Sequence, residues 1–269
     1  MEEASNTIRT LWHGPPLSVY ERLSLLSFLR HGHKVEIYTY GQLDVPPGVH
    51  LCDASSVLPQ SEVFSYSRGP QKGSFAAFSN LFRYKILFEK GGIWADLDFL
   101  CLGPLHELPD ACLGRMVWES REQLNVALMK FPVGNLICKT LYEKAKTLGQ
   151  NIDVGEASNA LVSAVLGQVE VPCTIFPVPA FYPIHWRETW KLFDPDETTY
   201  CETQVRSSFC VHWWNTAFRY IGLSKEALPP KGSFLHKHAE TVFRNSELKA
   251  WTIETLKNGI NNFRNLGVG

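Results

Sequence analysis

The stretch from residue 78 to residue 102 constrains the fold more than any other part of the chain. It reads FSNLFRYKILFEKGGIWADLDFLCL. Apolar residues at helical spacing predict a helix over Phe78–Lys90, with Arg83 on its exposed surface. The Gly-Gly pair that follows predicts the helix end, because glycine enters the left-handed conformation cheaply. A short buried strand then begins at Ile93, so a helix returns directly into a sheet.

An acidic pair, Asp96 and Asp98, stands at or just past the end of this strand. Residues two apart in an extended chain face the same side. Two carboxylates on one side can hold a hard divalent cation together with the hydroxyls or phosphates of a ligand. The bare triplet is also ordinary turn chemistry, so its meaning depends on the residues around it.

The bulk composition indicates a folded α/β chain and excludes some partners. Its 269 residues suffice for one large domain or two small ones, and an apolar content of 45% allows a sizeable core. The formal net charge is −1, without a strongly basic block. Nucleic acid is therefore not expected as a partner, because phosphate binding needs clustered Lys and Arg.

The seven cysteines and the chain start bear on the compartment. No Cys-x-x-Cys pair occurs, which disfavours structural zinc and favours reduced, buried thiols. The acidic, polar start MEEASNTIRT has no signal-peptide pattern, and no stretch is apolar enough to span a bilayer. We therefore expect a cytoplasmic enzyme with at most peripheral membrane contact, or a trimmed form of an anchored one.

The first fifty residues predict the start of a nucleotide-binding α/β sheet. A strand over Thr7–Trp12 precedes a helix that opens with a capping box, Ser18 and Glu21, and runs to about His31. A second strand follows over Val35–Tyr40. There is no Gly-x-Gly-x-x-Gly and no Walker loop, which disfavours dinucleotide and P-loop enzymes.

The remaining elements are predicted from local patterns. They are a short third strand (His50–Asp53), a strand continuing after the acidic pair (Phe99–Leu102), a hairpin of Arg115–Ser120 and Asn125–Lys130 that turns around Arg121–Gln123, helices at Asn135–Leu148 and Gly155–Leu166, a proline-rich sheet edge and loop (Pro172–Pro183), a lid-like loop (Trp186–Tyr200), a final strand (Phe209–Trp213) and a final helix (Ser246–Asn265).

The organising stretch resembles the sugar-binding region of DXD-containing glycosyltransferases. That family includes α-1,4-galactosyltransferase-like and initiating α-1,6-mannosyltransferase-like enzymes and the glucosyltransferase domains of large clostridial toxins. Its pattern is an Asp or Asn, an Arg, Gly-Gly, an aromatic residue and Asp-x-Asp. The matching residues are Asn80, Arg83, Gly91, Gly92, Trp94, Asp96 and Asp98.

Both ends of the chain carry further elements of the resemblance. The family's first strand runs into a turn like Leu11, Trp12 and His13, which would then line the nucleotide base and ribose. From the residues alone, a core position for Trp12 is as plausible as a site position, whereas His13 is favoured as a solvated loop residue. The family's second motif is His-x-Trp-Asn after an apolar strand. It is matched by His212, Trp214 and Asn215.

The resemblance implies three sets of site residues. The catalytic set is Arg83, Asp96, Asp98 and Asn125. The residues expected to bind the nucleotide sugar are Leu11, Trp12, His13, Asn80, Arg83, Asp96, Trp214 and Asn215. The expected metal ligands are Asp98, His212 and Asp96. Glu119, Asn125, Glu156 and Tyr182 fall where the family places sugar or acceptor contacts. Asn80 stands where some relatives have Asp, so no acid role is expected there.

The implied fold is a single α/β domain over residues 1–269, GT-A-like, with a mixed central sheet flanked by helices. Residues 1–130 would form the nucleotide-sugar half, and residues 131–269 the acceptor-side additions with the C-terminal metal and diphosphate motif. The implied reaction moves a hexose, with retained configuration, from a nucleotide sugar to an acceptor hydroxyl, with Mn²⁺ or Mg²⁺ as cofactor.

The donor and acceptor follow from the same resemblance. UDP is the favoured nucleotide over GDP, and the acceptor would be a glycan, a glycolipid or a protein in a polysaccharide-building role. Two other classes stay open from the residues alone. One is a haloacid-dehalogenase-type phosphatase, which also uses Asp-x-Asp after a strand, and the other is a catalytically inactive sugar-binding module.

Overall fold

The computed structural model describes residues 6–69, 71–149, 155–243 and 248–265. Its centre is a seven-stranded sheet of order β3-β2-β1-β4-β7-β6-β8, beside a two-stranded sheet of β5 and β9. The strands are β1 (Ile8–Leu11), β2 (Val35–Thr39), β3 (Val49–Asp53), β4 (Gly92–Ala95), β5 (Phe99–Cys101), β6 (Cys112–Trp118), β7 (Arg121–Phe131), β8 (Thr174–Phe176) and β9 (Cys210–His212).

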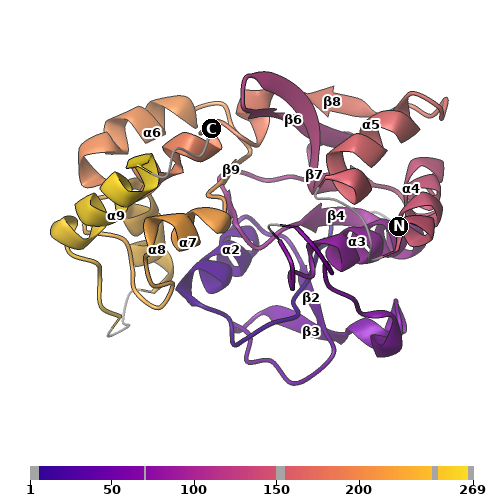
Figure 1. The fold of residues 1–269 in the computed structure, drawn as a ribbon, viewed down its shortest axis with the longest axis horizontal. Coiled ribbons are helices and arrows are strands. Elements are labelled where there is room, and N and C mark those ends of the chain that lie inside the picture. The colour runs from indigo at the N-terminus through magenta and orange to yellow at the C-terminus, as the bar shows by residue number, and fades with distance from the viewer. Residues whose placement is uncertain (1–5, 70, 150–154, 244–247, 266–269) are drawn as a thin grey trace.

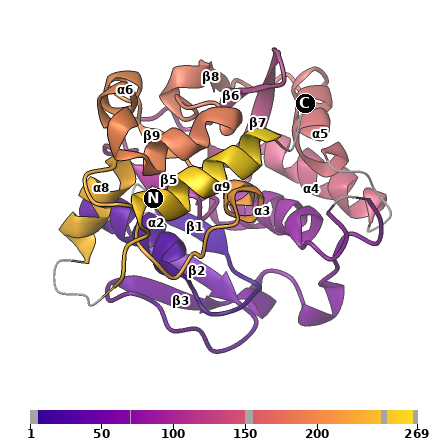
Figure 2. The ribbon, with the colours of Figure 1, turned by 60° about the vertical axis from the view of Figure 1, so that its left-hand side comes forward.

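Helices cover the sheet and form a separate group after it. They are α2 (Val19–Arg30), α3 (Ala76–Lys90), α4 (Leu136–Leu148), α5 (Leu161–Leu166), α6 (Thr198–Gln204), α7 (Thr216–Ile221), α8 (Phe234–Val242) and α9 (Ile253–Asn265), with a π-helical turn η3 (Glu156–Ala160) and a 3₁₀ helix η5 (Trp186–Phe193). Figures 1 and 2 show α4 and α5 on one side of the molecule and α6 and α8 on the other.

The sheet is mixed, as the resemblance implied. β3, β2, β1 and β4 run parallel to one another, whereas β7 pairs antiparallel with both β4 and β6. The parallel strands β1 and β4 are direct neighbours, so their carboxyl ends meet at one edge. In an open sheet with parallel strands, ligands bind at that edge, which here carries Trp12, His13 and the acidic pair.

The predicted opening of the chain is confirmed. Ser18 caps α2, with its side chain accepting from the Tyr20 N–H, and Glu21 completes the capping box. The helix ends at Arg30, and the strands on either side of it lie where the sequence predicts them. This local chemistry is sufficient because each signal acts within one turn of its own residue.

Gly91 ends α3 as predicted, with a φ of 63°. A side chain there would also collide with the neighbouring backbone, since an added Cβ would lie 2.7 Å from the Val133 nitrogen. Arg83, by contrast, is not on the helix surface as predicted. Only 3% of it is exposed, because its face of α3 turns toward the sheet edge and an acidic partner.

Two hydrophobic cores sandwich the sheet. On one face, side chains of α3, α4 and α5, among them Leu81, Ile137 and Val162, pack with Trp94 and Met129 of the strands. The opposite face is covered chiefly by α2 and by the segment that follows β5. This arrangement is the predicted mixed sheet flanked by helices.

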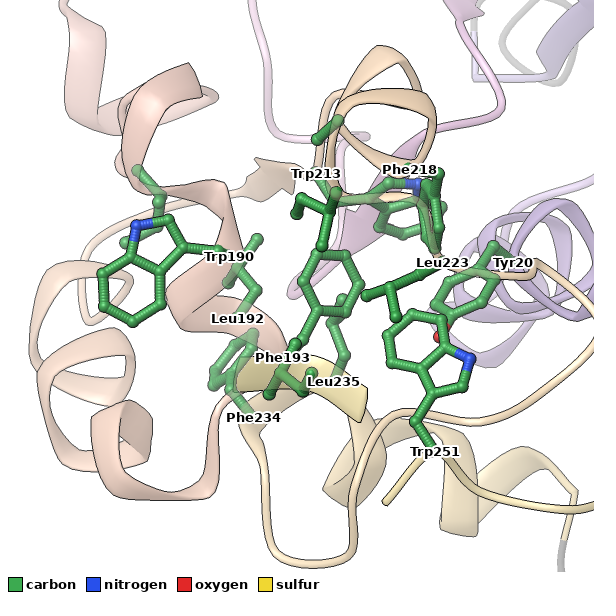
Figure 3. Close-up of a cluster of buried hydrophobic side chains, with 14 of the residues drawn as sticks. Tyr20, Trp190, Leu192, Phe193, Trp213, Phe218, Leu223, Phe234, Leu235 and Trp251 are labelled. Carbon is green, nitrogen blue, oxygen red and sulfur yellow. The ribbon is translucent and has the colours of Figure 1, made fainter. Parts of the chain in front are cut away.

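A third core joins the C-terminal helices to α2 and β9. Figure 3 shows Tyr20, Phe193, Phe218 and Trp251 gathered together in it. The segment after Trp186 was predicted as a loop that lids a site, but residues 186–193 form η5 and bury Trp190, Leu192 and Phe193 in this core. The aromatic residues are spaced to face inward, and that spacing outweighs the polar residues between them.

The hairpin and the final helix differ from their predicted bounds. β7 begins at Arg121, so the turn lies at Glu119 and Ser120 rather than around 121–123. Glu119 takes the left-handed conformation, φ 54°, that a two-residue hairpin turn needs. The final helix begins at Ile253; the predicted start at Ser246 lies outside the described residues.

The strand after the acidic pair does not continue in the main sheet. β5 pairs antiparallel with β9 instead, with Phe99 opposite His212. The chain therefore leaves the large sheet at Asp96 and Asp98 and enters the small one. Among the described residues, no helix is long and apolar enough to cross a membrane.

Candidate active site

One pocket of about 600 Å³ lies at the carboxyl edge of β1 and β4. The sequence-predicted residues that line it are Leu11, Trp12, His13, Asn80, Arg83, Asp96, Asp98, Asn125, His212, Trp214 and Asn215. They come from the ends of β1, β4 and β9, from α3 and from β7. Residues more than 200 positions apart in the sequence therefore face one cavity.

Asp96 is held in place by two partners on its own side of the pocket. Its Oδ1 accepts hydrogen bonds from Arg83 Nη2 at 2.6 Å and from Trp94 Nε1 at 2.7 Å. Arg83 Nη1 also donates to Asn80 Oδ1 at 2.8 Å, and its guanidinium lies 4.9 Å from the centre of the Trp94 ring. Arg83 is thus oriented before any ligand binds.

Asp98 is held by the C-terminal motif. His212 Nε2 lies 2.9 Å from Asp98 Oδ1, and the Asn215 N–H donates to Asp98 Oδ2 at 2.9 Å. The backbone of the same strand pair continues the contact, since the Trp213 N–H donates to the Asp98 carbonyl at 2.9 Å. The small sheet is therefore what joins the acidic pair to the distant motif.

The carboxyl groups of Asp96 and Asp98 differ in how readily they ionise. Burial raises the pKa of Asp96, and the nearby Asp98 charge adds to this while Arg83 opposes it. Burial acts in the same direction on Asp98, but the His212 charge and the hydrogen bonds from His212 and the Asn215 N–H outweigh it and lower its pKa. Asp98 is the carboxylate that stays charged most readily.

The turn that carries Trp214 is strained. Trp214 has a φ of 55°, a left-handed conformation that costs a non-glycine residue about 1–3 kcal/mol. Its ring lies 4.2 Å from that of His212, edge to face. Asn215 is fixed on the other side, because its Nδ2 donates to Glu21 Oε1 at 3.3 Å. Such strain persists where the surrounding contacts determine the geometry.

Trp12 and His13 stand at the opposite wall. Trp12 Nε1 donates to the Pro15 carbonyl at 2.7 Å, and the His13 ring lies 4.4 Å from the Phe75 ring, edge to face. Both residues are half-buried and line the pocket, so Trp12 is not closed off in the core and His13 is not a free loop residue.

Three residues given sugar or acceptor contacts do not line the pocket. Glu119 is exposed at the tip of the β6–β7 hairpin, and Glu156 is exposed on η3. Tyr182 is 2% exposed and lies behind Asn125, donating to its Oδ1 at 3.1 Å. Asn125 itself lines the pocket, and its Oδ1 also accepts from the Ala127 N–H at 2.7 Å.

The structure adds residues that the sequence reading did not single out. A polar wall of the pocket is made of Tyr66, Gln71, Ser74, Ser158 and Asn159. Lys225 is ion-paired with Glu21, whose carboxylate also binds Asn215. A single lysine in a loop belongs to no recognisable sequence pattern, so the ion pair between Lys225 and Glu21 is visible only in the folded structure.

The residues present suit a divalent cation in part. Two ligands that each lie about 2.1 Å from one cation at right angles are roughly 3 Å apart, close to the 2.9 Å between Asp98 Oδ1 and His212 Nε2. His212 Nδ1 is buried and has no hydrogen-bond partner in the described chain. An imidazole that binds a metal through Nε2 carries its proton on Nδ1, and that proton would have no acceptor here.

Within the described residues, no three His, Cys, Asp or Glu side chains converge as one metal cluster. The expected three-ligand set is therefore not assembled, since Asp96 is turned toward Arg83.

Comparisons with known sequences match both motif regions. Residues 50–118 match the model of the glycosyltransferase sugar-binding region containing the DXD motif. Residues 164–239 match the model of the alpha 1,4-glycosyltransferase conserved region. The first match includes Arg83 and the acidic pair, and the second includes His212 and Trp214. Two separate regions of this chain thus match glycosyltransferase models, and together they identify it as a glycosyltransferase with a DXD-containing region.

Both matches are to glycosyltransferase models, so this chain is a glycosyltransferase, and its fold is a mixed α/β fold with a seven-stranded central sheet. Neither match is to a phosphatase model. Comparison with curated proteins found no match to this chain. A solved structure titled PaToxG glycosyltransferase is similar at a TM-score of 0.46 and 13% identity, covering 97% of this chain and 85% of that chain.

Proposed function

We propose that this glycosyltransferase moves a hexose from a nucleotide sugar, UDP-linked rather than GDP-linked, to an acceptor hydroxyl with retained configuration. The observation that supports the proposal most is the meeting of Arg83, Asp96, Asp98 and His212 at one pocket with the end of β1. A single-domain chain divided near residue 130 into donor and acceptor halves stays a prediction.

The charge of the pocket argues for a cation. Among its described lining residues, Arg83 is the one permanent positive side chain, against the carboxylates Asp96 and Asp98. A diphosphate adds further negative charge in a confined space, where repulsion is poorly screened. We propose that Asp98 and His212 hold Mn²⁺, or less favourably Mg²⁺, because imidazole suits transition metals better. When bound, the cation supplies Lewis-acid stabilisation of the diphosphate leaving group.

The chain's own residues bind and orient the donor. Arg83 presents its remaining guanidinium edge to the sugar or the phosphates, already aligned by Asn80 and Asp96. Asp96 has a third of its side chain exposed and offers its second oxygen to sugar or ribose hydroxyls. Asn125 faces the same cavity. Its Oδ1 accepts hydrogen bonds from the Tyr182 hydroxyl and the Ala127 N–H, which hold the side chain in place.

Two aromatic walls hold the ends of the donor. Leu11, Trp12 and His13 are proposed to line the base and ribose, at the carboxyl end of β1. Trp214 and Asn215 are proposed to cover the diphosphate and exclude water, which strengthens the charge interactions beneath them. No protein nucleophile is assigned; in a retaining transfer the departing phosphate itself can serve as the base.

The proposed linkage is α-1,4, as in the description of the second matching family. The proposed acceptor is a glycan, a glycolipid or a protein in a polysaccharide-building role, which is what the motif resemblance implies. Cytoplasmic location and peripheral membrane contact stay predictions.

A donor panel tests the proposal. The protein is incubated with UDP- and GDP-hexoses and Mn²⁺, and release of the nucleoside diphosphate is measured, since transferases hydrolyse their donors slowly without an acceptor. We expect release from a UDP-hexose, loss of it with a chelator, and none from Asp98→Asn. Inorganic phosphate from a phosphomonoester would indicate a phosphatase, and no release from any donor would indicate an inactive module.

A further inference from the structure

Two cysteines stand opposite each other in the small sheet. Cys101 of β5 is the register partner of Cys210 of β9. The neighbouring residues are hydrogen-bonded, since the Leu102 N–H donates to the Phe209 carbonyl at 2.9 Å. Because hydrogen-bonded and non-hydrogen-bonded pairs alternate along an antiparallel ladder, Cys101 and Cys210 form a non-hydrogen-bonded pair. The Cα atoms of such pairs are typically about 4.5 Å apart, which lies within the range that a disulfide can bridge.

As register partners on antiparallel strands, Cys101 and Cys210 project from the same face of the small sheet. Hydrogen bonding from the Cys210 side chain is the largest influence that lowers the pKa of Cys101, with burial opposing it and His33 and His31 assisting. When protonated, Cys101 Sγ donates to the Gly103 carbonyl at 3.1 Å. Cys101 is 2% exposed and Cys210 is fully buried.

A second cavity gives Cys101 a route to solvent. It has a volume of about 260 Å³ and lies between α2, α8 and the small sheet, elements that Figure 2 labels close together. Cys101 and Ser27 line it together with the cationic side chains Arg30 and Lys237 and with His31. Among the described residues that line it there is no carboxylate, although Lys237 binds Glu202 at 2.7 Å. The cavity thus favours small anionic reagents.

We propose that Cys101 and Cys210 form a reversible disulfide by exchange with a small anionic disulfide that enters this cavity. The Cys101 thiolate attacks one sulfur of the reagent, which forms a mixed disulfide and releases one small thiol. Cys210 loses its proton, attacks the Cys101 sulfur and releases the second small thiol. Two protein thiols are oxidised by two electrons in all, and the reagent is reduced to two thiols.

The cross-link bears on the active site through the strands that carry it. Cys101 follows Asp98 by three positions, and Cys210 precedes His212 by two. A covalent bond between β5 and β9 would fix the approach of these two side chains. It also closes a loop of more than one hundred residues, which restricts the unfolded chain, so the oxidised form should melt at least about 5 °C higher.

Intact mass and peptide mapping test the proposal without using enzyme activity. The folded full chain is treated with glutathione disulfide, and the remaining thiols are then alkylated in denaturant. Of the seven cysteines we expect five to be alkylated, with Cys101 and Cys210 recovered in one disulfide-linked peptide and all seven alkylated after reduction. The melting temperature should rise with oxidation and return with reduction.

Single variants separate the two roles. Cys210→Ser has no thiol to resolve the intermediate, so it should retain one glutathione on Cys101. Cys101→Ser should keep its other six thiols free. Cys112→Ala is the matched control, because Cys112 is equally buried but lies opposite Thr174 and Lys130 in the large sheet; it should still lose two thiols. Seven alkylated thiols in the treated wild type, or a bond mapped to Cys112, Cys138 or Cys173, would overturn the proposal.

Discussion

His212 Nε2 lies 2.9 Å from Asp98 Oδ1, so a C-terminal strand end and the acidic pair at residues 96–98 form one site. The contact depends on the pairing of β5 with β9, which sets Phe99 opposite His212 and leaves Asp98 just beyond it. The site is thus built from two chain segments that the large sheet alone would not bring together.

Replacement of His212 should alter the metal requirement specifically. In His212→Ala we expect the Mn²⁺ concentration for half-maximal donor hydrolysis to rise at least about tenfold, since a ligand is lost, while the donor requirement changes less. His33→Ala is the matched control. His33 is also buried, but it binds the Leu105 N–H away from the pocket, so its loss should lower the melting temperature without moving the Mn²⁺ midpoint.

Arg83→Lys should be poorly tolerated despite keeping the charge. Arg83 bonds to Asn80 and Asp96 through different nitrogens, and a single ammonium cannot reproduce that fork. We expect kcat/KM to fall about a hundredfold or more, equivalent to roughly 3 kcal/mol. Arg206→Lys, at an exposed position, should leave the kinetics unchanged. If Arg83→Lys retains both rate and affinity, Arg83 does not contact the donor.

Tyr20→Phe should stabilise the protein slightly. The Tyr20 hydroxyl is buried in the C-terminal core with no hydrogen-bond partner in the described chain, and burial raises its pKa. Removing an unsatisfied hydroxyl should leave the free energy of unfolding unchanged or raise it by up to about 1 kcal/mol. Tyr84→Phe should lower it by about 1 kcal/mol, because that hydroxyl donates to the Ala157 carbonyl at 2.8 Å. In denaturant melts, Tyr84→Phe alone should lose free energy of unfolding; a loss in both variants would show that the Tyr20 hydroxyl has a partner.

Gly91→Ala should destabilise the protein by about 1–3 kcal/mol, or several degrees in melting temperature. The residue has a φ of 63°, and its new methyl group would lie 2.7 Å from the Val133 nitrogen. Gly41→Ala is the control, since its Cβ would meet nothing within 4 Å. Equal melting temperatures for the two variants would mean that the turn after α3 relaxes freely.

The acidic pair, Arg83 and the opening strand–helix–strand unit were predictable because their signals are local. The capping box of Ser18 and Glu21, the glycine stop at Gly91 and the strand that precedes Asp96 each depend on a few neighbouring residues. The match of these residues to a known motif predicts that they surround one ligand.

The parts that were missed depend on distant contacts. The residues of η5 look like a polar loop until α2, α7 and α8 supply the core that their aromatic side chains enter. Arg83 looked exposed because the helix pattern does not show an acidic partner at the sheet edge. The link from Lys225 through Glu21 to Asn215 joins three segments by tertiary structure alone.

Calorimetric titration of UDP into the protein, with and without Mn²⁺, tests the central claim most directly. If Asp98 and His212 hold a cation against the diphosphate, Mn²⁺ should tighten UDP binding at least about tenfold, and UDP should tighten Mn²⁺ binding by the same factor. Asp98→Asn, which keeps the shape of the side chain, should lose most of this coupling while the melting temperature stays within a few degrees. UDP affinity that is independent of Mn²⁺ in the wild type, or equal coupling in Asp98→Asn, would contradict the account.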